Sequence, residues 1–447
     1  MGAVELADVQ GLIVRGYTMP VGRYLGLSVR EPAAARAFLA ALIDDDPLVP
    51  SITTAQPWAV KPDCCVNAGI TFPGLAALGV PPESLAGFPM EYREGAVQRG
   101  ARVGDVGTSA PEHWLPWVAD PGLHLLLTVF AQSGDALDAA TKDLEQIWSA
   151  GCHELGRHDG AGLPDHVSHF GYRDGLSQPT IDGVPLSGLP DRLPRAPVGE
   201  FLLGYPSQFD HFSYPVPQPP ELGVNGSFAA LRILEQDVDA FAEFLTRQAA
   251  ATGMTEELIA AKLCGRWRNG TPLHLSPDTD TPDPPIPPEA LNDFDYAGAD
   301  ADERGYRCPI GSHIRRMNPR SQRVRGDNGH KRRIVRRGIP YGPPYDPTHP
   351  HDGQARGLLG LFIGVSLSDQ FEFLMAHWAN DGTFAAGLGR TNDPLIGAHA
   401  NGTGSFSIPR PEGRVVLPGI TRFVTTRGGA YCFLPSITAI RYLANLA

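Results

Sequence analysis

The sequence has no long hydrophobic run and no excess of positive charge. Its longest apolar stretch, around Leu125 to Phe130, is far too short to span a bilayer. The N-terminus has no basic segment followed by an apolar one, and Leu6 stands where a myristoylation signal needs Ser or Thr. A net charge of -12 argues against nucleic acid or an anionic membrane as the main partner. We therefore expect a cytoplasmic protein with no membrane or nucleic-acid partner.

Cysteine is also scarce. The 447 residues include six cysteines, and their spacing is not that of a metal site. Scattered reduced thiols are the natural interpretation, which excludes a disulfide framework. In contrast, 51 glycines and 43 prolines without a collagen-like period predict long loops and many turns. Because 42% of the residues are hydrophobic, the chain can build the cores of two or three globular domains.

Hydrophobic periodicity predicts an α+β fold built from a repeated unit, a strand followed by a helix. The unit occurs at 124–130 with a helix from Asp135, and again at 226–234 with a helix that carries Phe241. A third copy has a strand at 358–365 and a helix that carries Phe371 and Trp378. We infer an internal duplication into two halves, each an antiparallel sheet with its helices on one face.

Other segments have simpler patterns. Residues 10–14 are expected to be extended, 32–43 and 436–446 helical, and 65–72 a strand. The Pro-rich segment 186–220 is the best candidate for a connection between the halves. The acidic, Pro-rich segment 276–302 is expected to form a long surface loop in the second half.

The run from Phe170 to Gln178 contains the first candidate for chemistry. Gly171 and Gly175 flank a Tyr-Arg-Asp triplet, so the backbone can turn sharply and approach a flat or bulky group while Asp174 is held at the bend. Asp-Gly pairs mark ordinary turns more often than active sites. On its own, this run is a weak indication of function.

The segment from Cys308 to Gly338 contains the second candidate. Of the 14 histidines only His313 and His330 lie in this strongly cationic stretch, and a neutral imidazole is the commonest protein ligand for a metal. His330 is typical of an exposed turn. One acid, Asp327, accompanies the cationic residues of the basic block: Arg315, Arg316, Arg320, Arg323, Arg325, Lys331, Arg332, Arg333, Arg336 and Arg337. The block is either a solvated face paired with the acidic loop or a cradle for bound anions.

Three separated segments resemble the dye-decolorizing peroxidases, a family of haem enzymes. The Gly-Tyr-Arg-Asp-Gly run at 171–175 is similar to the family's Gly-Phe-x-Asp-Gly signature, with Tyr172 in place of Phe. The segment 308–320 resembles the one that carries the proximal haem histidine. The segment 336–342 resembles the one whose first arginine reaches the distal side of the haem. The resemblance extends from near Asp8 to the C-terminus.

The resemblance implies the fold and the activity. It implies two ferredoxin-like domains with antiparallel sheets and peripheral helices: residues 1–200 carry the distal motif, and residues 201–447 bind most of the haem. It implies an oxidoreductase with one haem b per chain, which reduces hydrogen peroxide and oxidises dyes, phenols or similar reductants. An oligomer is compatible with the sequence.

The resemblance also assigns roles to residues. Asp174 would move the peroxide proton, and Arg336 would stabilise charge as the O–O bond breaks. His313 would bind the iron from the other face. A carboxylate on the remaining N–H of His313 would increase its electron donation, and Asp393 and Asp369 are the candidates.

The remaining site residues would line or hold the cofactor. Gly171, Tyr172 and Gly175 would lie against the haem, and Tyr172 adds a phenol that could be redox-active. Arg315 and Arg320 would pair with haem propionates or, alternatively, form surface ion pairs. No aromatic residue of the distal side can be placed around Leu359 and Leu361 from the sequence.

Two other functions are compatible with the sequence. The first is a haem-binding or haem-handling protein with low peroxidase turnover, which would need His313 but not Asp174 or Arg336. The second is a cofactor-free α+β protein whose basic block binds a partner. An absorbance spectrum of the purified protein separates the second from both haem proteins.

Overall fold

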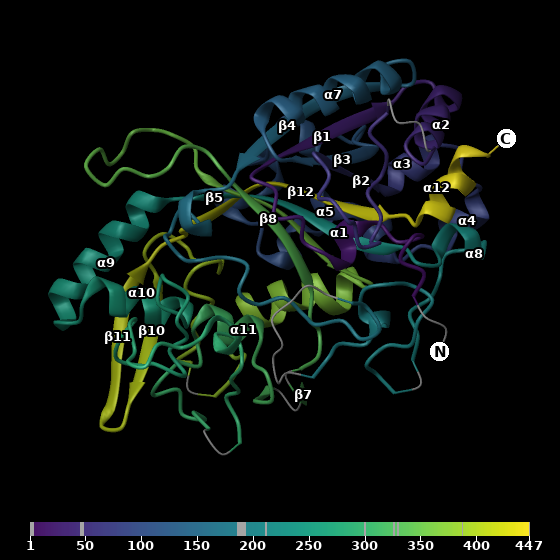
Figure 1. Ribbon diagram of the computed structural model, residues 1–447. Coiled ribbons are helices and arrows are strands. Elements are labelled where there is room, and N and C mark those ends of the chain that lie inside the picture. The colour runs from purple at the N-terminus through teal and green to yellow at the C-terminus, as the bar shows by residue number, and fades with distance from the viewer. Residues whose placement is uncertain are drawn as a thin grey trace.

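A continuous antiparallel sheet forms the centre of the molecule (Figure 1). The computed structural model describes residues 4–44, 49–185, 194–210, 212–298, 301–324, 327–328, 330–386 and 388–446. The first half contributes the strands β1 (Val21–Val29), β2 (Cys64–Ile70), β3 (Leu125–Ala131) and β4 (Cys152–Ala161). The second half contributes β5 (Ser227–Gln236), β8 (Val335–Tyr341), β9 (Gly357–Gly364) and β12 (Val424–Leu434).

The two halves have the same strand order. Along the sheet β4-β1-β3-β2-β12-β5-β9-β8, each half places its fourth strand beside its first, followed by its third and second. All of these pairings are antiparallel, and the halves join where Ile70 of β2 pairs with Phe433 of β12. This repeated order is ferredoxin-like, so the predicted α+β fold with two duplicated antiparallel halves is confirmed. The two sheets are continuous, which the sequence did not indicate.

The sheet curls until its two edge strands, β4 and β8, come into contact. Gly160 of β4 allows this close approach, since a Cβ atom there would lie 2.5 Å from Ile339 Cγ2 and 2.8 Å from the Pro340 carbonyl oxygen. This contact shields backbone N–H and C=O groups of the edge strands, which could otherwise pair with a strand of another chain. It also places the first half directly beside β8.

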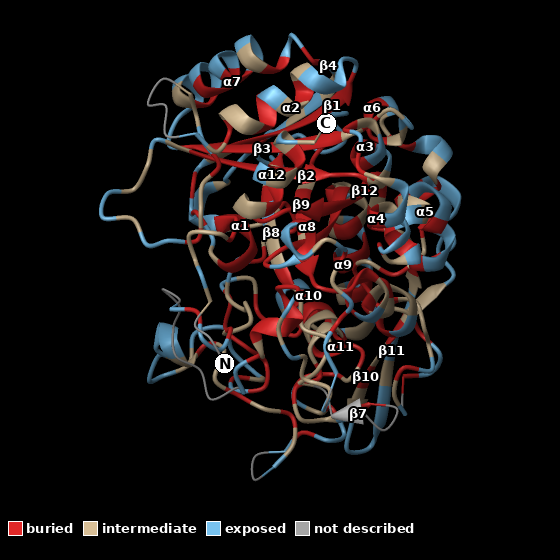
Figure 2. Cartoon of the chain, turned by 90° about the vertical axis from the view of Figure 1, so that its right-hand side faces the viewer, coloured by how far each residue is buried: buried red, intermediate tan, exposed pale blue. Residues whose placement is uncertain are grey.

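Successive residues of each strand point to opposite faces of the sheet. Side chains on both faces are buried, so both faces are covered by the rest of the protein. On β3, Leu125, Leu127 and Val129 pack into one core with helices, while Leu126 and Phe130 pack into a second core shared by the two halves. This explains why β3 is apolar throughout in the sequence rather than alternating. Figure 2 shows buried strands through the middle of the molecule and helices with exposed outer faces around them.

Most of the regular helices begin at sequence signals. The helix α7 (Gly134–Trp148) starts after Ser133, whose hydroxyl accepts a hydrogen bond from the Ala136 N–H, and α9 (Val238–Thr252) starts in the same way after Asp237. The other α-helices are α2 (Pro32–Ala41), α3 (Phe72–Ala77), α4 (Pro82–Ala86), α5 (Met90–Arg99), α6 (Pro116–Ala119), α8 (Pro220–Gly223), α10 (Glu256–Cys264), α11 (His313–Met317) and α12 (Ile437–Ala444).

Smaller elements complete the description. The short 3-10 turns are η1 (Gly100–Val103), η2 (Gly107–Ser109), η3 (Pro111–His113), η4 (Pro164–His166), η5 (Val198–Glu200) and η6 (Pro288–Ala290). Two small antiparallel pairs are formed by β10 (Gly404–Arg410) with β11 (Gly413–Ile420) and by β6 (Arg323–Val324) with β7 (Asp327–Asn328). In Figure 1 the pair β10 and β11 lies at the same end of the molecule as α9, α10 and α11.

One secondary-structure prediction was wrong. Residues 10–14, expected to be extended, contain the short helix α1 (Gly11–Val14), since a short apolar run does not distinguish strand from helix. The helix predicted to carry Trp378 is confirmed, but it consists of two π-helical segments, η7 (Leu367–Glu372) and η8 (Leu374–Ala379). Wide helical turns of this kind are often found at functional sites.

A buried ion pair fixes the π-helical segment to the first half. Glu372, which is 2% exposed, accepts two hydrogen bonds of 2.5 Å from Arg99 of α5 and a third of 2.9 Å from the Tyr431 hydroxyl. Farther along, the Asn380 side chain donates to the Val103 carbonyl at 3.2 Å. The middle of the segment is therefore held by α5, and its C-terminal end by the turn η1 that follows α5.

The two Pro-rich segments lack long regular elements where they are described. Of the predicted connection 186–220, residues 186–193 and 211 lie outside the described residues, and the remainder is irregular apart from η5 and the start of α8. The predicted loop 276–302 contains only η6 in its described part, 276–298 and 301–302. Nowhere in the described chain does a helix combine the length and apolar character needed to cross a membrane.

Candidate active site

His313 is the first residue of α11, and its Nδ1 atom lies 3.0 Å from Asp393 Oδ2. The sequence alone left Asp393 and Asp369 as alternatives for this contact. Asp369 lies elsewhere, half-exposed and 3.8 Å from Arg332. Within the described residues no protein group hydrogen-bonds to the other ring nitrogen, Nε2, of His313. With Nδ1 donating to the carboxylate, Nε2 carries the lone pair that a metal ligand needs.

The Asp393 carboxylate is fully buried and bonded on both oxygens. Its Oδ1 accepts hydrogen bonds from the backbone N–H groups of Leu395 and Ile396, at 2.9 and 3.0 Å. Burial by itself would raise the pKa of Asp393, but His313, the charge of Arg316 and the backbone donors together lower it. Asp393 is therefore an ionised acceptor that fixes the orientation of the His313 ring.

A second cluster joins Arg336 of β8 to the run 170–178. The Gln178 side chain accepts from the Arg336 N–H at 3.2 Å and donates to the Arg336 carbonyl at 2.8 Å, as a neighbouring strand would. The Arg336 guanidinium donates to the Ser177 carbonyl oxygen. These bonds hold the loop that carries Asp174 against Arg336. Gln178, which stands at the end of the singled-out run, was not recognised as this anchor.

Asp174 is exposed, at the turn of this loop. Its Oδ1 accepts a hydrogen bond of 2.7 Å from the Gly175 N–H, and its own N–H donates to the His166 carbonyl. Gly171 and Gly175 have φ values of +87° and +77°, which glycine adopts without strain, so both are required by the turn itself. Tyr172 anchors the loop in an apolar cluster: it is buried beside Phe241, and its hydroxyl donates to the Ala260 carbonyl at 2.7 Å.

Beside Arg336, Gly338 of β8 and Gly360 of β9 form a flat patch of backbone that carries no side chains, which we call the floor. Gly338 and Gly360 are partners in register, and a Cβ atom on Gly338 would meet only the Leu359 carbonyl oxygen, at 3.5 Å. On Gly360 a Cβ atom would meet the Phe362 ring at 3.4 Å. Phe362 is the register partner of Arg336 and is half-buried. A flat, wide group such as a haem fits this floor.

Phe362 is an aromatic residue on this face, and the sequence analysis did not identify it. Leu359 and Leu361 point the other way, into the core shared by the two halves. Strict alternation along β9 puts Phe362 on the face opposite Leu361, so the period of two was the available signal. This alternation places Phe362 beside Arg336 only once the register between β9 and β8 is known.

The expectation that Arg315 and Arg320 bind propionates is corrected by the structure. Arg315 is fully buried, and its guanidinium donates to the Asp302 carboxylate at 3.1 Å and to the Asp302 carbonyl at 2.7 Å. Arg320 is 3% exposed, donates to the Asn292 carbonyl at 3.0 Å and lies 3.7 Å from the centre of the Phe294 ring. Both cations fix the acidic loop, so their donors do not face an open site.

Part of the basic block, Arg315 and Arg320, therefore contacts the acidic loop 276–302. His330 adds a second contact, with Nε2 3.7 Å from Asp295 Oδ2. Arg332 instead stacks 3.6 Å above the Phe373 ring, and Arg337 donates to the Leu12 carbonyl at 2.8 Å. Arg325 lies outside the described residues. Arg336 is the member of the block that belongs to the cluster around Asp174.

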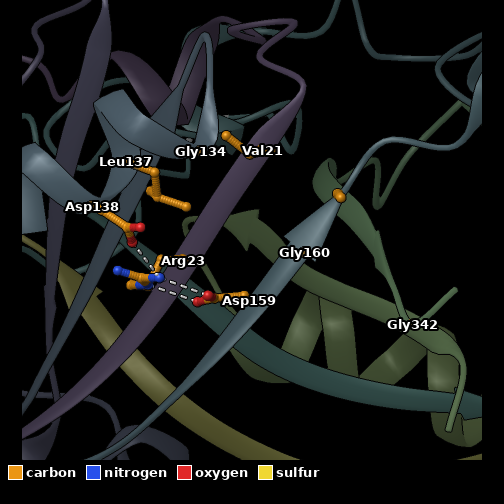
Figure 3. A pocket seen from close by; sticks show the side chains of 9 residues that line it. Val21, Arg23, Gly134, Leu137, Asp138, Asp159, Gly160 and Gly342 are labelled. Atoms are coloured by element: carbon orange, nitrogen blue, oxygen red, sulfur yellow. Dashed lines mark hydrogen bonds and ion pairs between the residues drawn. The ribbon is translucent and has the colours of Figure 1, made fainter.

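A cavity of about 290 Å³ lies away from these clusters, where β1 and α7 approach the seam between β4 and β8 (Figure 3). Arg23 points toward Asp159 and Asp138 there, with hydrogen bonds of 2.7 Å to both oxygens of Asp159 and a 3.0 Å contact to Asp138. Arg23 therefore pairs with both carboxylates that line this cavity. None of the predicted site residues lines it.

Comparison with known proteins covers almost the whole chain. The chain is 29% identical to "Peroxidase 2" of Mycetinis scorodonius in an alignment 465 residues long that covers 98% of this chain and 87% of that protein. It is also 29% identical to a dye-decolorizing peroxidase of Mycena epipterygia in an alignment 481 residues long that covers 99% of this chain and 87% of that one. No family model matches the sequence.

Solved structures agree with these relatives. A dye-decolorizing peroxidase in complex with 2,6-dimethoxyphenol superposes with a TM-score of 0.84 and 26% identity, covering 99% of this chain and all of that one. A similarity of this extent includes both halves of the sheet and every segment described above. The pair formed by His313 and Asp393 and the loop that carries Asp174 thus lie in a fold shared with these enzymes.

Proposed function

Because this chain belongs to the dye-decolorizing peroxidase family, we propose that it is a haem peroxidase that reduces hydrogen peroxide while oxidising dyes, phenolics or similar one-electron donors. The observation that carries the proposal is the 3.0 Å contact between His313 Nδ1 and buried Asp393, which leaves Nε2 for a metal. Each chain would bind one haem b. The second half, 201–447, would hold most of the haem, and the first half, 1–200, would supply the distal loop.

When bound, the haem would supply the iron that takes peroxide and the electrons that reduce it. His313 Nε2 would bind the iron, while its Nδ1 proton stays with Asp393 and keeps the ring in one orientation. A negative carboxylate on Nδ1 makes the ring a stronger electron donor, which favours O–O cleavage. Gly338, Gly360 and Phe362 would line the opposite face.

Asp174 would accept the proton of peroxide and return it to the departing oxygen. Its exposed position, with one carboxylate oxygen already bonded to the Gly175 N–H, leaves the second oxygen for this transfer. Arg336 would supply fixed positive charge next to the breaking bond. Its bond to the Ser177 carbonyl and the Gln178 bonds to its backbone keep the two groups in one unit.

Turnover of a phenol and of a bulky dye tests the proposal. The haem-loaded chain is expected to oxidise 2,6-dimethoxyphenol and a large dye only when peroxide is added. A haem-handling protein, the alternative, would bind haem through His313 but gain nothing from Asp174 and Arg336. Slow turnover that is unaffected by the loss of both residues would favour this alternative.

Gly338→Val tests whether haem lies on the open floor. The new side chain meets little in the protein itself, because the nearest atom to a Cβ there is the Leu359 carbonyl oxygen at 3.5 Å. It would intrude on a bound macrocycle, and overpacking of this kind costs about 1–3 kcal/mol. We expect weaker haem binding with unchanged urea unfolding of the haem-free chain. Unchanged haem affinity would show that the macrocycle lies elsewhere.

Electrons from bulky reductants would reach the haem through Tyr or Trp side chains. The candidates nearest to the site segments, Tyr172, Tyr341 and Trp378, are all buried, so each could relay an electron but not touch a dye. We expect that at least one of the three Phe variants oxidises a large dye more slowly while reacting normally with peroxide. If all three oxidise the dye at the parent rate, the relay begins at other aromatic residues or the dye reaches the haem edge.

We propose residence in the cytoplasm because the cysteines are free thiols. Cysteine placement agrees with a reducing compartment. The six cysteines are free, and five of them are buried. Burial raises the pKa of several of these thiols, including that of Cys152 to about 11, so they stay protonated and unreactive at neutral pH.

A further inference from the structure

A fully buried arginine lies one helical turn after His313. Arg316 is on α11 with His313, is 0% exposed and donates only to main-chain carbonyl oxygens. Its Nη1 donates to the Trp378 carbonyl at 2.6 Å, its Nη2 to the Thr391 carbonyl and its Nε to the Gly311 carbonyl at 3.3 Å. Its guanidinium thus joins α11 to the segments around Trp378 and Thr391, which lie 62 and 75 positions farther along the chain.

Burying this cation is costly, and no ion pair within the described residues offsets the cost. Arg315 beside it has the Asp302 carboxylate, whereas the salt bridges formed by described residues do not include Arg316. Burial lowers the pKa of Arg316 to about 10, although the charges of Asp393 and Asp381 act to raise it. The hydrogen bonds to carbonyl oxygens are thus the interactions that hold this cation in place, and the segments that they join indicate its role.

Two of the carbonyls that Arg316 binds belong to the segments that hold Asp393. Thr391 precedes Asp393 by two residues, so its carbonyl is close to the carboxylate along the chain. Trp378 precedes Ala379, whose carbonyl oxygen accepts the Asp393 N–H at 2.7 Å. The planar guanidinium reaches both segments from the helix that carries His313. It therefore sets the distance between the His313 ring and the Asp393 carboxylate.

We propose that Arg316 is a positioning residue for the axial pair: it holds Asp393 against His313 Nδ1 and, through that contact, sets how strongly His313 donates electrons to the haem iron. The proposal rests on the proposed haem function and adds a determinant that the sequence did not indicate. Arg316 touches neither haem nor substrate, so it acts only through the hydrogen bond between His313 and Asp393.

The variant Arg316→Lys tests the proposal because it keeps the charge and removes the planar fork that bridges two carbonyls. The readout is the ferric–ferrous midpoint potential of the haem-loaded chain, measured by spectroelectrochemistry. Weaker donation from His313 destabilises the ferric form, so we expect the potential to rise. A tenfold change in the equilibrium constant corresponds to about 59 mV for one electron, and we expect a shift of about this size, in the same direction as for Asp393→Asn.

A double-mutant cycle separates positioning from a general structural effect. If Arg316 acts through Asp393, Arg316→Lys shifts the potential in the parent but not in the Asp393→Asn background. The matched control is Arg266→Lys: Arg266 is 6% exposed and also donates to carbonyls, those of Gly270 and Leu291, away from the axial pair. Arg266→Lys should lower the free energy of unfolding and leave the midpoint potential unchanged.

Three results would overturn the proposal: no shift for Arg316→Lys, an equal shift in both backgrounds, or the same shift for Arg266→Lys. If Arg316→Lys does not fold, Arg316→Gln replaces it. Loss of the positive charge then shifts the midpoint potential in both the parent and the Asp393→Asn background. The difference between the two shifts still measures the part of the effect that acts through Asp393. A parent chain that retains no haem would instead contradict the proposed function, and the haem spectrum shows this before any variant is made.

Discussion

Replacing His313 with Ala is expected to abolish haem retention or to weaken it greatly. His313 is the residue whose Nδ1 is held by Asp393 and whose Nε2 is left for a metal. The change also leaves the buried Asp393 carboxylate without its side-chain partner, which destabilises the site further. The measurement is the haem content and Soret absorbance of the variant purified alongside the parent.

The matched control for this variant is His330→Ala. His330 lies in the same basic block and also faces a carboxylate, with Nε2 3.7 Å from Asp295. It has no role in the proposed site, and its loss should leave haem content unchanged. Full haem occupancy in His313→Ala, with the parent spectrum, would show that the axial assignment is wrong.

The reaction with peroxide is expected to slow strongly when either distal residue is removed. Asp174→Asn removes the proton acceptor, and general-base catalysis is typically worth about 10²–10⁴ in rate. Arg336→Leu removes fixed positive charge beside the breaking bond, and one stabilising donor is typically worth about 10²–10³. Stopped-flow absorbance of the haem-loaded variants mixed with peroxide measures both.

The chain contains a close control for Asp174. Asp182 is also exposed, is also followed by glycine and also accepts a hydrogen bond from that glycine's N–H, at 3.1 Å. Asp182→Asn changes the same turn chemistry outside the run 170–178 and should react with peroxide at the parent rate. Parent-like rates in both Asp174→Asn and Arg336→Leu would contradict the peroxidase mechanism.

The sequence identified the site residues that lie in compact local motifs. His313 and the run around Asp174 could be singled out because glycine placement and residue type are visible within a few positions. The partner of His313 could only be narrowed to two carboxylates, since 80 positions separate His313 from Asp393. Choosing between Asp393 and Asp369 required the tertiary contact.

Charge along the sequence was a poor guide to which arginines face a site. Arg315 and Arg320 resemble anion-binding residues by position, yet both are buried against the acidic loop. Arg316 had no distinguishing signal, because its carbonyl partners lie at 311, 378 and 391. Burial of a long cationic side chain is decided by folding of distant loops, which a local pattern does not contain.

The topology was predictable to the level of two antiparallel halves. Alternating and periodic apolar residues indicated most of the strands and helices that carry each half, including β3 with α7 and β5 with α9. The continuity of the two sheets depends on one pair of residues, Ile70 and Phe433, at strand edges. Such edge pairing leaves no periodic signal in either strand.

The absorbance spectrum of the purified, haem-loaded chain, recorded before and after addition of peroxide, tests the central claim most directly. The account predicts a Soret band typical of a histidine-bound haem that changes promptly with peroxide and returns when a phenol or dye is added. A chain that retains no haem, or a haem spectrum that peroxide leaves unchanged, would contradict the proposed function.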